Sequence, residues 1–238
     1  TYVSEIAPSS QRGKMVALYQ FNIVLGILMA FVSNYFFRNF GNEPWRWMVG
    51  IEALPSILYL IGVWTIPQSP RWLIIKKNKV KKKQKKFFEI TKYDMPEKML
   101  KKLISEQNDV HNQNLFIKKF SLPILLAFLF ALFNQLSGIN AFLYYAPRIF
   151  ESAGLESSSA LLGTIGIGIA NLIFTLLGLY LIDKAGRKLL MYIGSIGYIV
   201  SLTLVSLAFI NSWEGLSVPL FLFIFIASHA IGQGAVIW

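Results

Sequence analysis

Residues 120–146 read FSLPILLAFLFALFNQLSGINAFLYYA, a run that is long enough to cross a lipid bilayer. A spanning helix needs about 20 predominantly apolar residues, and inside lipid the backbone must satisfy its own hydrogen bonds. The run therefore predicts a membrane helix. Its second half nevertheless carries four polar side chains, those of Asn134, Gln135, Ser137 and Asn140. Polar groups at membrane depth usually face a bundle interior or a water-filled cavity, so one side of this helix is expected to face such a space.

The composition extends this reading to the whole chain. The 238 residues are 55% hydrophobic and 15% charged, with a mean hydropathy of +0.52, whereas soluble domains carry about 25% charged residues. We therefore expect an all-α membrane protein. Six runs reach spanning length: residues 15–37, 47–66, 120–146, 158–182, 189–210 and 216–238. The chain starts without Met and ends inside an apolar run, so an internal piece of a longer chain is expected.

The distribution of positive charge predicts the topology. Of the 23 Lys and Arg residues, 20 fall in one set of alternating connections, and 15 of these lie in residues 71–119. The positive-inside rule places that set, including residues 71–119, in the cytoplasm. No aromatic module accompanies the lysines, which argues against nucleic-acid binding. Because a structureless connection of this length is unusual, we expect two amphipathic helices in it, at residues 76–90 and 96–107.

Five short stretches together resemble the sugar porter family of the major facilitator superfamily. They are EIAPSSQRGK (5–14), PQSPRWL (67–73), QLSGIN followed by YY (135–145), DKAGRK (183–188) and GQGAVIW (232–238). Each motif alone is weakly specific, but the five occur in family order and spacing, and the resemblance covers essentially the whole chain.

The resemblance implies an incomplete major facilitator fold of about six full transmembrane helices and a cytoplasmic helical linker. On this reading, residues 1–70 end the N-terminal bundle, from the tail of helix 4 through helices 5 and 6. Residues 71–119 are the lysine-rich linker, and residues 120–238 start the C-terminal bundle with helices 7–10. The expected location is the inner (plasma) membrane, with several passes.

The resemblance also implies a site for a monosaccharide. The residues that match the family's sugar-contacting positions are Gln20, Gln135, Asn140, Asn171 and Trp238. Tyr144, next to Tyr145, matches an aromatic gate over the sugar. Asn134 departs from the family, which commonly has a second glutamine there, so its contact is either lost or bridged by water. A neutral amide both donates and accepts hydrogen bonds, as a sugar hydroxyl does.

Helical spacing adds a condition to this site. Gln135 and Asn140 lie about 140° apart around a regular helix, so they can line one cavity only if the helix bends between them. Gly138 stands between them. The alternative is that these amides only bond neighbouring helices. His229 either titrates near neutral pH or packs as a neutral ring, and the second is favoured.

Charged residues suggest two further roles. Glu52 resembles a glutamate of the proton-coupled members, although it can also be an interfacial residue near the outer surface. A cytoplasmic clamp that opens and closes the transporter is expected from a larger set: Glu5, Arg12, Arg71, Asp183 and Arg187.

The sequence therefore predicts transport of a hexose or pentose by alternating access, with proton symport favoured. Facilitated diffusion and a transporter-like sugar sensor are the alternatives. No nucleophile–base set, phosphate loop or metal-ligand cluster is apparent, so neither an enzyme nor a cofactor is expected. The expected partners are the sugar, a proton and the lipid bilayer.

Overall fold

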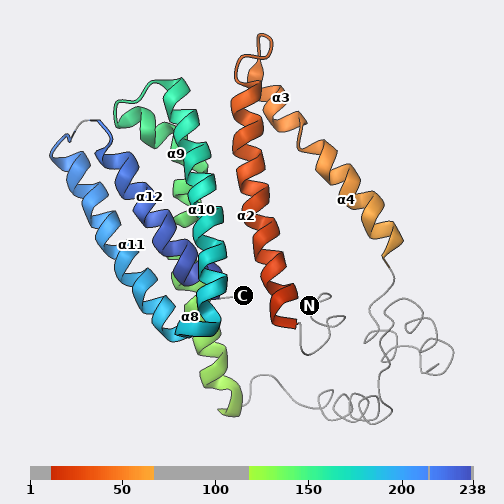
Figure 1. Cartoon of the computed structure of the whole chain (residues 1–238), viewed down its shortest axis with the longest axis vertical. Coiled ribbons are helices and arrows are strands. Elements are labelled where there is room, and N and C mark those ends of the chain that lie inside the picture. Colours follow the sequence, from red (N-terminus) through yellow and green to blue (C-terminus); the bar gives the residue numbers. More distant parts are fainter. Residues whose placement is uncertain (1–11, 67–117, 214, 237–238) are drawn as a thin grey trace. The chain divides into compact units, whose positions relative to one another are not determined.

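The computed structural model describes residues 12–66, 118–213 and 215–236 (Figure 1). Every regular element in these ranges is a helix. The α-helices are α2 (Arg12–Phe37), α3 (Pro44–Gly50), α4 (Ala53–Thr65), α8 (Ser121–Leu136), α9 (Ile139–Ser152), α10 (Ser157–Ala185), α11 (Arg187–Ile210) and α12 (Ser217–His229). A 3₁₀ turn, η1 (Lys118–Phe120), precedes α8, and a π-helical turn, η2 (Ala230–Gly234), follows α12.

The six predicted spans are confirmed in the described residues. Helices of spanning length and apolarity cover Leu18–Phe37, Pro44–Thr65, Ser121–Ser152, Ser157–Ala185, Arg187–Ile210 and Ser217–Gly234. Several expectations lie outside the described residues: Glu5, Arg71, Trp238, the side chain of Arg12 and the two helices of the linker. The linker and the division into residues 1–70, 71–119 and 120–238 stay predictions.

The span expected as one helix over residues 47–66 is interrupted between α3 and α4. Pro55 has no N–H, so it cannot donate to the carbonyl of Ile51 four residues earlier. The N–H of Leu54 donates to that carbonyl instead, at 3.1 Å, which tightens the turn. Glu52 lies in this interruption, and its side chain is exposed.

The chain divides into two compact units. One takes in Thr1–Val16 and Leu58–Ala127, of which the structure describes the first turn of α2, most of α4 and the start of α8. The other takes in Ala17–Ile57 and Phe128–Trp238, and it holds the buried core. In this second unit α10 packs against α9, α11 and α12, and α11 lies alongside α12 (Figure 1).

Aromatic and aliphatic side chains fill the core of the second unit. Phe150, Ile167, Leu222 and Phe225 are almost fully buried there. The ring of Phe225 lies 4.8 Å from that of Phe142, which joins α12 to α9. By contrast, α4 and α8 bury no residue within the described part of the chain. The core therefore comes mainly from α9 to α12.

Glycines allow α11 and α12 to approach each other closely. A Cβ built on Gly194 would lie 2.7 Å from Cα of Gly232 and 2.7 Å from the carbonyl oxygen of Ser228. A Cβ on Gly197 would lie 2.3 Å from Oγ of Ser228. Small residues commonly bring membrane helices together in this way, because lipid supplies no hydrophobic drive for helix association.

We predict that Gly194→Ala destabilises the protein by about 1–3 kcal/mol, the usual range for overpacking a tight contact. The added methyl group would press on the backbone of Gly232, which cannot move aside as a flexible side chain would. Thermal unfolding in detergent measures the effect. Gly26→Ala in α2 is the control, because a Cβ there meets nothing within 4 Å. Equal melting temperatures for the two variants would contradict the packing described above.

Candidate functional site

The helix expected over residues 120–146 is broken at Gly138, as the spacing argument requires. α8 ends at Leu136, Gly138 has a φ of +78° and α9 begins at Ile139. The N–H of Gly138 donates to the carbonyl of Gln135 at 3.2 Å, and Oγ of Ser137 donates to the carbonyl of Asn134 at 2.6 Å. These bonds satisfy part of the backbone at the break, as a segment in lipid requires. The first N–H groups of α9 have no intrahelical partner, as at any helix start.

The break brings Gln135 and Asn140 together. Nδ2 of Asn140 donates to Oε1 of Gln135 at 2.9 Å, although the two residues lie on different helices. Both side chains are exposed, so their remaining donor and acceptor groups are open to a ligand. Asn140 keeps a free carbonyl acceptor and Gln135 keeps two N–H donors.

Asn134 makes a second contact, with a residue far away in sequence. Nε2 of His229, the last residue of α12, lies 3.3 Å from Oδ1 of Asn134. His229 is buried, in agreement with the expected packed ring, and Asn134 is half-buried. The contact joins the end of α8 to the end of α12.

Gln20 lies on the inner face of α2. Val24, one turn further along, is buried, and Ile27 and Phe31 pack against the core. Gln20 itself is buried, and its Oε1 has no hydrogen-bond partner in the described part of the chain. A buried acceptor without a partner costs free energy, so this oxygen is suited to receive a donor from a ligand or from water.

Asn171 lies in the middle of a buried stripe on α10. Gly168, one turn earlier, faces Leu28 and Phe31 of α2, and Gly178, two turns later, faces Ile231 of η2. Asn171 is buried on the same side of the helix. Its amide is thus placed on the face of α10 that meets both α2 and η2.

Tyr144 and Tyr145 are both exposed in the part of the chain that the structure describes. Their side chains are 77% and 59% exposed. Their proposed gating role therefore stays a prediction.

Two of the charged clamp candidates, Asp183 and Arg187, lie in the described part of the chain. Asp183, at the end of α10, and Arg187, at the start of α11, are both exposed and form no ion pair with each other. The chain turns between them at Gly186, which has a φ of +80°. Lys184 contacts the hydroxyl of Tyr180. The clamp itself stays a prediction.

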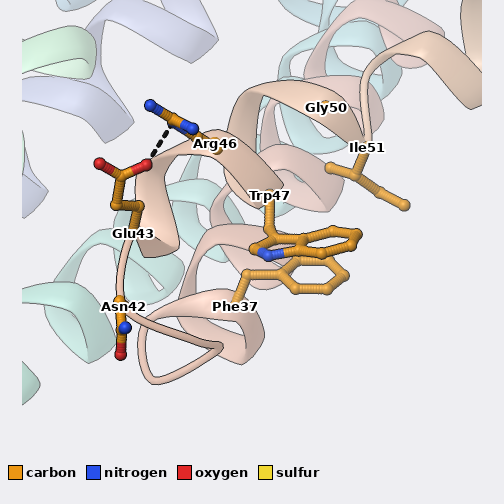
Figure 2. Close-up of a pocket in the computed structure, with 7 residues that line it drawn as sticks. All are labelled: Phe37, Asn42, Glu43, Arg46, Trp47, Gly50 and Ile51. Atoms are coloured by element: carbon orange, nitrogen blue, oxygen red, sulfur yellow. Dashed lines mark ion pairs between the residues drawn. The ribbon is translucent and has the colours of Figure 1, made fainter.

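A shallow depression of about 830 Å³ lies at the junction of α2 and α3 (Figure 2). Seven residues line it: Phe37, Asn42, Glu43, Arg46, Trp47, Gly50 and Ile51. Glu43 and Arg46 form an ion pair among these residues, and the rings of Phe37 and Trp47 lie next to each other (Figure 2). None of the predicted sugar-contacting residues lines it, so it is distinct from the site where Gln135 and Asn140 meet.

Two further buried polar residues, Gln233 and Thr175, are not among the predicted site residues. Nε2 of Gln233 donates to the hydroxyl of Tyr198 at 3.1 Å, while Oε1 of Gln233 is buried without a partner in the described residues. The hydroxyl of Thr175 is also buried without a described partner. Thr175 lies four residues after Asn171, and that spacing could have revealed it.

Known proteins resemble this chain over its full length. A family described as "Sugar (and other) transporter" matches residues 1–238. The putative metabolite transport protein YwtG of Bacillus subtilis is 37% identical over 247 residues, which cover 100% of this chain and 52% of YwtG. The D-xylose-proton symporter of Escherichia coli is 32% identical over 259 residues, covering 100% of this chain and 50% of the symporter.

The fold is also that of a solved transporter. The partially occluded, inward-open structure of the xylose transporter XylE from E. coli matches with a TM-score of 0.83 and 30% identity, covering 99% of this chain and 53% of XylE. The chain thus spans about half the length of these proteins. Names among the relatives include proton symport as well as facilitated glucose transport.

We predict that Gly138→Ala destabilises the break by about 1–2 kcal/mol, because an L-residue other than Asn or Asp pays that cost for a left-handed backbone. Space is not the obstacle, since the nearest atom to the added Cβ would be 3.7 Å away, on Phe142. Gly138→Asn should lose less, because asparagine tolerates this conformation. Melting temperatures in detergent give the order, and a Gly138→Asn variant less stable than Gly138→Ala would contradict it.

Proposed function

The chain belongs to the sugar transporter family of the major facilitator superfamily, and we propose that the full-length protein carries a monosaccharide across the plasma membrane by alternating access. One observation carries the proposal. The helix break at Gly138 holds the amides of Gln135 and Asn140 side by side, with donors and an acceptor left over. A multi-pass membrane protein gains nothing from exposing such groups in a spanning segment unless they meet a polar ligand or water.

The chemistry of the cluster fits a sugar. Gln20, Asn134, Gln135, Asn140 and Asn171 are all neutral amides in the second unit. Each sugar hydroxyl needs a donor and an acceptor, and an amide supplies both without a charge. Gln20 adds a buried acceptor that no described residue uses. We propose these residues as the sugar contacts, with Trp238 as a further one.

Relatives named for both glucose and xylose support a hexose or pentose as the substrate. We propose that Tyr144 and Tyr145 close the site from outside. The clamp on the cytoplasmic side, in this proposal, is formed by Glu5, Arg12, Arg71, Asp183 and Arg187, beside the lysine-rich residues 71–119.

We further propose that the sugar is transported together with a proton. Glu52 lies inside a spanning segment, where an ionised carboxylate costs about 2.5–3.5 kcal/mol at the centre of a helix. We propose Glu52 as the residue that carries the proton during the cycle. Facilitated diffusion is the alternative, and relatives of both kinds exist. A sugar sensor that binds without transport is the second alternative.

The first test removes one amide from the cluster. Asn140→Leu keeps the branching of the side chain but loses the hydrogen bonds. We expect the KM for uptake of radiolabelled D-glucose or D-xylose to rise by roughly tenfold, as the loss of one or two hydrogen bonds implies. Asn211→Leu is the control, because that amide bonds only the backbone carbonyl of Leu207 at the end of α11. An equal change in KM for both variants would argue against the site.

The second test addresses the proton. Glu52→Gln should abolish sugar accumulation driven by a pH gradient while leaving sugar exchange across the membrane intact, because exchange needs no net proton movement. Glu43→Gln, in the neighbouring loop and paired with Arg46, should leave accumulation unchanged. If uptake by the unaltered protein brings no protons with it, symport is wrong and facilitated diffusion stands.

A further inference from the structure

We infer that His229 is a positioning residue that sets the orientation of the Asn134 amide for sugar binding. The inference rests on the proposed function, because it assumes that Asn134 and Gln135 face the sugar. It starts from one contact, the 3.3 Å approach of Nε2 of His229 to Oδ1 of Asn134. The two residues are 95 positions apart in sequence, so only the fold brings them together.

The imidazole is held in place by its surroundings. His229 is only 8% exposed, and its ring lies 6.3 Å from the ring of Phe225, one turn earlier on α12. Phe225 is in turn packed against Phe142 of α9 and Tyr198 of α11. A ring fixed on this aromatic group presents its Nε2 at a constant place.

The direction of the hydrogen bond follows from the atoms. The carbonyl oxygen Oδ1 of Asn134 can only accept, so Nε2 of His229 carries the proton and donates it. This arrangement leaves both N–H donors of Asn134 available, since no described residue accepts from them. Without the histidine the amide would be free to turn over and exchange its carbonyl and NH₂ groups.

The side-chain amide of Gln135 is also held in one orientation by a hydrogen bond to its carbonyl oxygen. Oε1 of Gln135 accepts from Asn140, so the NH₂ group of Gln135 is also left over. The end of α8 thereby presents N–H donors from two consecutive residues, each with its carbonyl already occupied. Such a pair recognises the lone pairs of sugar hydroxyl oxygens.

Asn134 has a short side chain, and this explains why its orientation needs to be fixed by the histidine. The resemblance places a longer glutamine at this position, and Asn reaches one methylene less far. We infer that the fixed orientation compensates for the lost reach. His229 then acts on the sugar only through Asn134.

Four variants of the full-length protein test this: His229→Phe, His229→Gln, Asn134→Leu and the double variant of Asn134→Leu with His229→Phe. His229→Phe keeps a ring but loses the donor, and the KM for D-glucose or D-xylose uptake should rise about 3- to 10-fold at an unchanged maximal rate per molecule, as the loss of one hydrogen bond implies. His229→Gln restores an N–H at nearly the same place and should recover most of the affinity. In a protein that already carries Asn134→Leu, His229→Phe should change KM no further.

The control lies on the neighbouring helix α11. Tyr198→Phe removes the hydroxyl that accepts from Gln233 at 3.1 Å, so it disturbs a comparable buried hydrogen bond without touching Asn134. It should change thermal stability and leave KM unaltered. Protein abundance, measured by size-exclusion chromatography of the detergent-solubilised protein, normalises all rates.

The outcomes separate the inference from the function it rests on. An unchanged KM in His229→Phe, or additive effects of His229→Phe and Asn134→Leu, would overturn the positioning role while sugar transport stands. If the unaltered protein shows no saturable uptake of either sugar and binds neither, the proposed function is wrong and the inference falls with it.

Discussion

The rest of the structure depends on the requirement that a backbone inside lipid pair its own N–H and C=O groups. A helix meets this requirement everywhere, so any break needs local partners. At Gly138 the partners are close at hand: the Gly138 amide bonds Gln135, the Ser137 amide bonds Phe133, and the Ser137 hydroxyl bonds Asn134. Glycine supplies the left-handed backbone at little cost. These bonds satisfy part of the backbone at the break, and the break brings the amides of Gln135 and Asn140 together.

The other interruptions obey the same requirement by different means. Between α3 and α4 a proline removes a donor, and the amide of Leu54 replaces it. After α12 the helix widens into a π turn that still bonds internally, at Ala230–Gly234. Each interruption lies within three residues of a polar side chain in a spanning segment: Glu52, Gln135 and Gln233. Widened turns of this kind occur often at functional sites. Irregular backbone and polar chemistry thus coincide in this chain.

Most of the fold was predictable because it follows from hydropathy and length, which a single sequence displays. The bend at Gly138 was predictable too, since Gln135 and Asn140 cannot share a side of a regular helix. The interruption at Pro55 was missed, although its cause is one visible residue, because a proline often remains within a membrane helix. The contact of Asn134 with His229 could not be predicted. It depends on where α12 lies against α8, and no local pattern records that. The roles of Trp238, Glu5 and Arg71 stay predictions.

The position of His229 is itself a consequence of how α12 is anchored. Ser228, its neighbour in sequence, sits against Gly197 of α11, and Gly232 sits against Gly194. One side of the helix is therefore held at backbone distance, and the hydrogen bond from Gln233 to Tyr198 adds a polar tie to the same neighbour. Consecutive residues on a helix point about 100° apart, so fixing Ser228 towards α11 turns His229 towards a different neighbour. Small residues on one helix thus determine the direction of a polar group on the next, and through it the orientation of an amide on α8.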